Sequence, residues 1–245
     1  MKIIFLGTNG WYTTPTGNTP CVLIDSKDHY VVFDAGNGIY KLDKYIVEDK
    51  PISLFISHFH IDHISGFHSL GKFKFSQKID IYMAQGRKKD FDTLVNPPFT
   101  SPKPSTQITI NELSEGKHQI PFPVEIIEQF HTYRDHGYRV TLEEKTIAYS
   151  GDCGISEGSM ILAKNADLLI HECSYKADHP PSNWGHVGPI EAAKLAKVAG
   201  VKKLILNHFD ASLYTTMEDR KEAEKQAQAI FPNTIAATDD LIITL

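Results

Sequence analysis

The feature that most constrains this chain is a cluster of four potential metal ligands directly after an apolar run. The run Ile52–Ser57 is followed at once by His58, His60, Asp62 and His63. Side chains alternate along an extended segment, so His58 and His60 are expected on one side, and a turn can carry Asp62 and His63 to a second point nearby. Imidazole and carboxylate ligands suit Zn²⁺, Mn²⁺ or Fe. The spacing therefore predicts a metal site at a strand end, and an accidental histidine-rich loop is the weaker alternative.

Apolar runs rich in Ile, Val and Phe recur along the chain, each bounded by turn-forming residues, and they predict strands. The predicted strands are Lys2–Leu6, Cys21–Asp25, Tyr30–Phe33, Ile52–Ser57, Ile79–Met83, Gln107–Leu113, Val124–Phe130, Tyr138–Leu142, Thr146–Ser150, Leu168–His171, Lys203–Leu206 and Leu241–Leu245. Helices are predicted over Glu157–Ala163, Pro189–Ala199 and Met217–Ile230, and another is expected after His63. No strand–helix alternation is visible in the first half, which favours packed sheets with helices outside.

Length and charge limit the range of functions. A chain of 245 residues fits one large domain, and we expect residues 1–245 to form a single one. The net charge of −5 argues against a protein that holds nucleic acid by bulk charge alone. A local basic patch would still allow RNA as a substrate.

The cysteines and the apolar runs indicate a cytoplasmic protein. Cys21, Cys153 and Cys173 form no CxxC pair, which favours a reducing compartment over a disulfide framework. The apolar run at the N-terminus is shorter than a signal peptide requires, and no stretch approaches the length of a membrane span. No membrane partner is therefore expected.

The segment His58–His63 resembles the signature of the metallo-β-lactamase superfamily. That resemblance implies an α/β (α+β) fold, a four-layer αββα sandwich with a two-metal site at one edge. Three later segments, each following a predicted strand, resemble the remaining ligand motifs of the family. They are Gln129–His131, Tyr149–Asp152 and Leu206–His208. The resemblance thus covers most of the chain.

The resemblance implies two metal ions, each held by three residues of its own and both bridged by one aspartate. The implied ligands are His58, His60 and His131 for the first ion, Asp62, His63 and His208 for the second, and Asp152 for both. Two Zn²⁺ ions are expected, and Mn²⁺ or Fe would also fit these ligands. A hydroxide held between the two ions would be the nucleophile, oriented by Asp62.

Five segments are similar to ribonuclease Z and its close relatives. They are Phe5–Gly10, His131–Arg139, Leu169–Cys173, Gly185–Gly188 and Lys203–Asp210. By this resemblance His186 acts beside the scissile phosphate and donates a proton to the leaving oxygen, while Glu172 keeps it protonated. Val187 and Gly188 stand where that family has Ser and Thr. A loop-capping His186 and a purely structural Glu172 are the competing interpretations.

One departure from ribonuclease Z bears on the substrate. That family carries an inserted basic, glycine-rich arm that grips tRNA, and the stretch from Arg139 to His171 has no room for it. The favoured function is therefore a binuclear metal-dependent phosphodiesterase acting on a small phosphodiester or a nucleotide or RNA substrate. The alternatives are a tRNA 3′-processing endonuclease, an ester or lactone hydrolase, and a non-catalytic metal-binding regulatory domain. The resemblance also suggests a homodimer.

Several residues near the motifs allow two interpretations each. Tyr138 and Arg139 could position a substrate phosphate or serve a structural ion pair. Trp11, Tyr12 and Trp184 could line the entrance of the site or simply pack.

Overall fold

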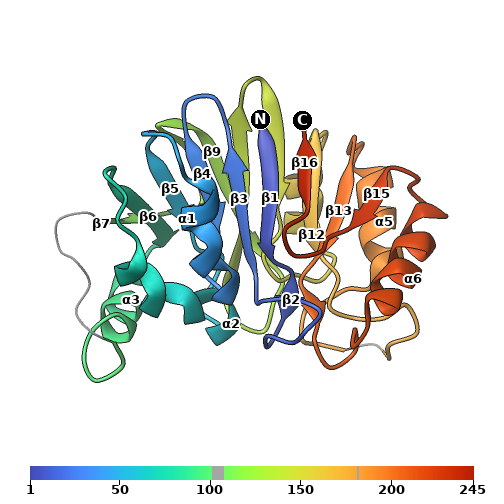
Figure 1. Cartoon of the computed structure of the whole chain (residues 1–245). Helices are drawn as coiled ribbons and strands as arrows, with labels where there is room; N and C mark the ends of the chain where they lie inside the picture. Colours follow the sequence, from blue (N-terminus) through green and yellow to red (C-terminus); the bar gives the residue numbers. More distant parts are fainter. Residues whose placement is uncertain (101–107, 181) are drawn as a thin grey trace.

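The strands of the chain form two large sheets. The computed structural model describes residues 1–100, 108–180 and 182–245; Gln107, the first residue of one predicted strand, lies outside them. Each large sheet has seven strands within the described residues, and β2 (Asn9–Gly10) pairs with β14 (Phe209–Asp210) apart from both. In Figure 1 the two sheets stand in the middle of the molecule with helices on both outer sides.

The first sheet has the strand order β16-β1-β3-β4-β5-β6-β7. Its strands are β1 (Lys2–Gly7), β3 (Cys21–Asp25), β4 (Tyr30–Phe33), β5 (Ile52–Phe55), β6 (Ile79–Ala84), β7 (Ile108–Leu113) and β16 (Ile242–Thr244). Pairing is antiparallel from β16 to β4 and parallel from β4 to β7. The crossovers carry η1 (Asn37–Lys41), α1 (Leu42–Tyr45), α2 (Ile61–Ile64), η2 (Ser65–Lys72) and α3 (Lys88–Leu94).

The second sheet has the order β15-β13-β12-β11-β10-β9-β8. Its strands are β8 (Gly116–Ile120), β9 (Phe122–Gln129), β10 (Asp135–Leu142), β11 (Lys145–Tyr149), β12 (Leu168–Glu172), β13 (Leu204–Asn207) and β15 (Thr234–Ala236). Strands β11, β12, β13 and β15 run parallel. The helices α4 (Glu157–Ala163), α5 (Pro189–Val198) and α6 (Met217–Gln228) connect them. Because carboxyl ends of parallel strands share one edge, residues that follow them converge there.

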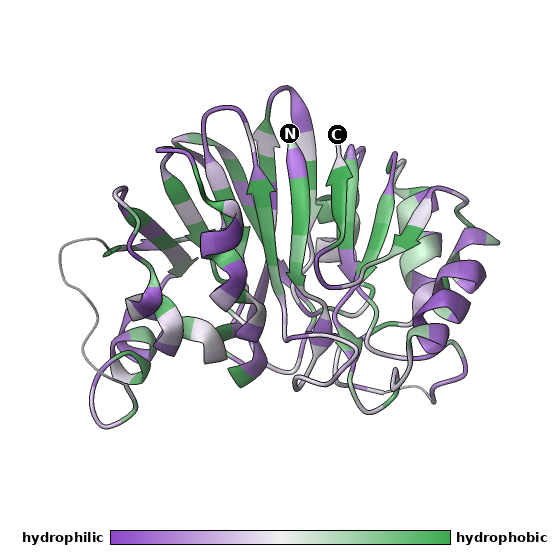
Figure 2. Ribbon diagram, viewed as in Figure 1, coloured by the Kyte–Doolittle hydropathy of each residue, from purple (hydrophilic) through white to green (hydrophobic). Residues whose placement is uncertain are grey.

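Alternation along the strands explains the layers. In β1, Ile3 and Phe5 join a core that also holds residues of the second sheet, whereas Ile4 and Leu6 face helices on the other side. In β13, Ile205 joins the central core and Leu204 packs with the helices of the second sheet. Strands covered on both faces read as continuous apolar runs, which Figure 2 shows as green strands between more hydrophilic outer helices. This arrangement confirms the predicted αββα layers.

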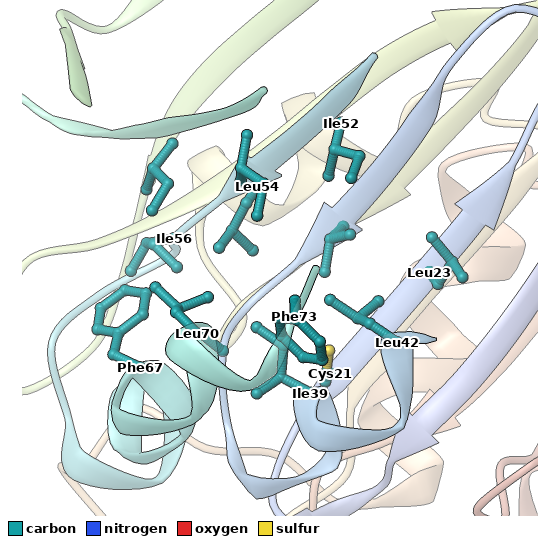
Figure 3. Close-up of a cluster of buried hydrophobic side chains, with 14 of the residues drawn as sticks. Cys21, Leu23, Ile39, Leu42, Ile52, Leu54, Ile56, Phe67, Leu70 and Phe73 are labelled. Carbon is teal, nitrogen blue, oxygen red and sulfur yellow. The ribbon is translucent and has the colours of Figure 1, made fainter. Parts of the chain in front are cut away.

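The outer core of the first sheet shows how short helices cover it. Figure 3 shows Ile52 and Leu54 of β5 on the same side as Phe67 and Leu70 of η2. All four side chains are at least 95% buried. Burying large aliphatic and aromatic side chains stabilises the fold by about 1.5–3 kcal/mol each.

One expectation about this half is wrong. The first half does alternate strands and helices, because β4, β5, β6 and β7 are parallel and helices lie between them. These helices have four to eight residues each, too few turns for an apolar period to show in the sequence. The helix expected after His63 is the 3₁₀ helix η2, preceded by the single turn of α2.

The predicted strands are found within a few residues of their expected bounds, and four strands escaped prediction: β8, β15 and the two-residue strands β2 and β14. Strand β8 lies at a sheet edge and is largely exposed, so it lacks an apolar run. Strand β15 has only three residues. The predicted strand Ile52–Ser57 ends early, at Phe55, and Ser57 donates its backbone N–H to the Asp34 carboxylate at 2.8 Å.

A buried arginine links helix α6 to the segments that contain β2 and β14. Arg220 is 1% exposed and donates to Thr8 Oγ1 at 2.7 Å, to the Ala237 carbonyl at 2.9 Å and to Asn9 Oδ1. Its guanidinium lies 4.6 Å from the centre of the Phe209 ring. Thr8 precedes β2, Asn9 is its first residue and Phe209 follows His208, so the Arg220 side chain contacts both segments.

We expect Arg220→Met to lower the free energy of unfolding by about 2–4 kcal/mol, because it leaves several buried acceptors without donors. Urea unfolding followed by circular dichroism measures this. The control is Lys221→Met, since Lys221 pairs with Glu218 in a bridge whose two side chains are 74% and 76% exposed. That change is expected to stay within about 0.5 kcal/mol. Equal effects of the two substitutions would contradict the role given to Arg220.

Two further observations concern the whole chain. Within the described residues, every helix is too short or too polar to traverse a lipid bilayer. Cys21, Cys153 and Cys173 are buried free thiols.

Candidate metal centre

The segment after β5 carries four of the predicted ligands. After Phe55 the chain leaves the strand and passes through His58 to His60, which is extended, and the single turn α2 then carries Asp62 and His63. His58 and His63 are buried, while His60 and Asp62 are partly exposed. The turn thus separates the four side chains into two pairs.

The other three predicted ligands follow strands of the second sheet. His131 comes after β9, Asp152 after β11 and His208 after β13. His208 has a left-handed backbone with φ of 54°, which a non-glycine residue adopts at a cost. Its ring lies against Gly10, where an added Cβ would come within 2.5 Å of the imidazole. Close approach of these two segments therefore requires glycine at position 10.

The structure brings these seven side chains into two adjoining groups. Within each group the ligand atoms lie within 4.8 Å of one another. The first group is His58, His60, His131 and Asp152, and the second is Asp62, His63 and His208. Asp152 reaches both groups: its Oδ1 lies 3.2 Å from His63 Nε2 and 3.1 Å from His208 Nε2, and its Oδ2 lies 3.8 Å from His58 Nε2. This is the position that a bridging carboxylate would need.

Outer partners turn the imidazoles toward the centre. His63 Nδ1 lies 2.8 Å from Asp34 Oδ2, and His208 Nδ1 lies 2.9 Å from Ser174 Oγ. His58 Nδ1 lies 3.0 Å from a carboxylate oxygen of Asp135. Partners at Nδ1 set the tautomer and leave Nε2 free to bind a metal ion.

Asp34, Asp135 and Ser174 are the residues that the sequence analysis missed. Asp34 also accepts from the Ser57 hydroxyl at 2.9 Å and the Tyr149 hydroxyl at 2.6 Å. The available signal was a polar residue at the end of a buried strand, since Asp34 directly follows β4. Asp135 and Ser174 carry no comparable signal.

The electrostatics of the site differ between the two groups. Burial, together with the neighbouring His63, lowers the pKa of His58 to about 3, and burial also lowers the pKa values of His60 and His131. Although burial opposes charge, the Asp152 carboxylate raises the pKa of His63 and of His208. The first group therefore offers neutral imidazoles, and the second favours positive charge beside its carboxylates.

The donor set fits divalent cations. His58 Nε2 and Asp152 Oδ1 are buried and have no hydrogen-bond partner, because the nearby imidazoles do not meet hydrogen-bond geometry. His63 Nε2 and His208 Nε2 face each other at 3.0 Å. Buried polar atoms without partners are costly, and a cation among them would satisfy all of them together.

His186 and Glu172 lie together beside the seven residues. His186 Nδ1 is 3.1 Å from Glu172 Oε1, and its ring is 4.9 Å from the ring of His131. Glu172 also accepts the backbone N–H groups of Val187 at 3.0 Å and Ser174 at 2.7 Å. Although burial opposes charge, this carboxylate raises the pKa of His186 to about 9.

Two of the open candidates lie away from the site. The Tyr138 side chain is fully buried and donates to the Ile56 carbonyl at 2.6 Å. Arg139 donates to the Leu162 carbonyl at 2.7 Å and lies 3.9 Å from Glu125. Both residues therefore have structural partners, and the structural interpretation applies to them.

An open cavity of about 670 Å³ lies over the two groups. Its lining is Gly10, Trp11, His60, Ile61, Asp62, Asp152, Ser174, Tyr175, Trp184, His186, His208 and Asp210. Neither lysine nor arginine is among these described residues. The volume falls in the range of small-molecule sites.

The sequence of the chain matches a known family. Residues 29–209 match the family model described as "Beta-lactamase superfamily domain". The chain is 26% identical to the probable metallo-hydrolase YhfI of Bacillus subtilis, over 85% of this chain and 87% of that protein. It is 27% identical to ribonuclease Z of Bacillus velezensis, over 100% of this chain and 99% of that one.

Solved structures have the same fold. The crystal structure of YhfI aligns with a TM-score of 0.83 at 24% identity over 99% of both chains. The short form of human tRNase Z aligns with a TM-score of 0.78 at 25% identity, over 100% of this chain and 99% of that one. The chain therefore belongs to the beta-lactamase superfamily, in its ribonuclease Z-like branch of metallo-hydrolases.

Proposed function

We propose that this protein is a phosphodiesterase that binds two divalent metal ions, Zn²⁺ by preference, with Mn²⁺ or Fe as alternatives. The first ion would be held by His58, His60 and His131, the second by Asp62, His63 and His208, and Asp152 would bridge them. When bound, such a pair supplies an activated water and polarises a phosphoryl oxygen. The two groups of ligand atoms described above support this assignment.

The residues around the ligands would direct the reaction. Asp62 Oδ2 accepts the Trp11 backbone N–H at 2.8 Å and lies 3.2 Å from His208 Nε2, so its carboxylate is held in one orientation, from which it would orient the attacking water. Glu172 binds His186 through Nδ1, which leaves Nε2 as the atom that would donate a proton to the departing oxygen.

The charged His186–Glu172 pair is the observation that carries the proposal. Metal ligands of this kind serve esters and lactones as well as phosphodiesters. A carboxylic ester or lactone is neutral, whereas a phosphodiester carries a negative charge that a cationic His186 attracts. The Glu172 carboxylate, 3.1 Å from His186 Nδ1, raises the pKa of His186 and so favours that charge at neutral pH.

The surroundings of the site favour a small substrate. A polyanionic RNA needs several cationic contacts, and the described cavity lining contains neither Lys nor Arg. Between Arg139 and His171 the chain forms only the rest of β10, β11, α4 and most of β12. The alignment with the Bacillus ribonuclease Z runs over 308 positions, so that relative has residues without counterparts in these 245.

A tRNA 3′-processing endonuclease is the second candidate, favoured by the relatives named ribonuclease Z and tRNase Z. An ester or lactone hydrolase and a non-catalytic metal-binding domain remain weaker alternatives. We further propose that residues 1–245 act as one domain, since both sheets share the central core. A cytoplasmic location agrees with the free thiols, and the homodimer stays a prediction from the family.

A substrate panel tests the proposal. Metal-loaded protein is offered bis-p-nitrophenyl phosphate, cyclic nucleotides, p-nitrophenyl acetate, a lactone and precursor tRNA. We expect kcat/KM for the phosphodiesters to exceed that for the acyl substrates by about 100-fold or more, as differential recognition of charge allows. Chelator-treated protein is the control and should be inactive. A preference for acyl substrates or for precursor tRNA would replace the proposal by the corresponding alternative.

A further inference from the structure

Two exposed tryptophans line the cavity above the metal ligands. The Trp11 side chain is 65% exposed and Trp184 is 61% exposed, although indole is among the side chains that proteins bury most. The two residues lie in different halves of the sequence, yet both line the same cavity as His186. Large aromatic surface left open beside a reaction centre is typical of a binding site.

The backbone holds Trp11 in an unfavourable conformation. Trp11 has φ of 71°, in the left-handed region that a bulky residue rarely adopts. The Asn9 side chain fixes this loop through the carbonyls of Tyr12 at 3.1 Å and Gly17 at 2.9 Å, while the Trp11 N–H donates to Asp62 at 2.8 Å. The backbone of Trp11 is thereby tied to a predicted metal ligand, Asp62.

Trp184 is tied to the opposite side of the site. Its carbonyl accepts the Thr132 N–H at 3.3 Å, and the next carbonyl, of Gly185, lies 3.3 Å from His131 Nδ1. A Cβ on Gly185 would lie 2.5 Å from the Phe130 carbonyl oxygen, so the two segments are in close contact. The backbone of each tryptophan is therefore held at a set place relative to one group of ligands, so only the side chain remains to be ordered on binding.

We propose that Trp11 and Trp184 bind the planar base of a nucleoside phosphodiester while its phosphate lies at the metal ligands. This inference rests on the proposed function and names its substrate class. With the phosphate at the metal ligands, the cavity adds aromatic surface, and its described lining contains neither Lys nor Arg that would hold a second phosphate. Bases stack on aromatic side chains without sequence preference, so a cyclic nucleotide or a dinucleotide fits better than an alkyl phosphodiester or a long RNA.

Binding of two matched ligands tests this without relying on turnover. Adenosine 5′-monophosphate and ribose 5-phosphate carry the same phosphate and differ in the base. Titration calorimetry on metal-loaded protein should give about ten-fold tighter binding of the nucleotide or better, as base stacking on an aromatic ring produces. Trp11→Ala and Trp184→Ala should each remove most of that preference and leave the affinity for ribose 5-phosphate unchanged.

Control substitutions separate base binding by the two tryptophans from a general effect on the protein. Trp11→Phe and Trp184→Phe should retain the preference, and Tyr40→Ala, at an exposed aromatic residue outside the cavity lining, should not alter it. Equal affinity of wild type for the two ligands, or a preference that survives both alanine variants, would overturn the inference and leave the proposed function intact. Failure of metal-loaded protein to bind either ligand would instead overturn the proposed phosphate site and the inference with it.

Discussion

Replacing Asp152 by alanine is expected to remove bound metal and hydrolysis together. Its carboxylate reaches both ligand groups, with oxygens 3.1 Å from His208 Nε2 and 3.8 Å from His58 Nε2. Without it, the neighbouring imidazoles lose the negative charge that favours a cation between them. Metal catalysis lowers the activation barrier by several kcal/mol, so its loss should reduce kcat/KM on bis-p-nitrophenyl phosphate by about 10³-fold or more.

Elemental analysis of the purified variant and its steady-state rate measure this effect. Asp135→Asn, which alters a carboxylate beside His58 Nδ1, should have an intermediate effect of about 10- to 100-fold. The matched control is Asp167→Asn. Asp167 forms an ion pair with Lys202 and accepts the Thr146 backbone N–H, and it is not part of the cavity lining. An Asp152→Ala protein that retains two metal ions per chain would show that Asp152 does not bridge them.

The second large effect is expected for His186→Ala, which should keep the metal ions and lose rate. His186 is not among the two ligand groups, and its Nε2 is the atom that would protonate the departing oxygen. General acid catalysis by a positioned side chain contributes about 10²- to 10⁴-fold. The loss should be largest for a cyclic nucleotide, whose alkoxide needs a proton, and small for bis-p-nitrophenyl phosphate, whose phenolate leaves without one.

His179→Ala provides the matched control for this experiment. His179 stacks on Tyr175 with ring centres 3.8 Å apart and does not line the cavity, so its loss should change the rate by less than about threefold. Equal rate losses for alkoxide and phenolate leaving groups in His186→Ala would contradict proton donation by His186. Normal turnover of both would remove His186 from the mechanism.

The pH dependence of the rate separates proton donation from a structural role. Glu172 raises the pKa of His186 to about 9 against the effect of burial, so the donor is protonated below that pH and lost above it. Bound cations act in the opposite direction, so the alkaline fall in rate is expected at or below about pH 9. Glu172→Gln should shift that fall to lower pH, whereas a purely structural Glu172 would lower the rate equally at every pH.

Local sequence was sufficient to predict most strands and the ligand motifs. Apolar runs such as Ile52–Phe55 are buried on both faces, and a polar residue after such a run must leave the sheet at its edge. The spacing of His58, His60, Asp62 and His63 is short enough that one turn of chain settles their arrangement. The longer apolar strands and the histidine cluster were therefore predictable from neighbours along the chain, to within a few residues at the strand ends.

Contacts between distant segments were decided only by the tertiary structure. Nothing near Asp34, Asp135 or Ser174 in the sequence shows that each lies beside an imidazole from another strand. The convergence of Trp11 and Trp184 on one cavity, and the burial of Arg220 against Thr8, join residues more than 170 positions apart.

The physical reason is that alternation and turn chemistry act over a few residues, whereas strand order determines which edges meet. The sequence by itself determined which residues are buried in strands and which polar groups follow them. The pairing of the sheets determined which nitrogen of His58, His63 and His208 faces the centre, because the partner at Nδ1 comes from another strand or loop.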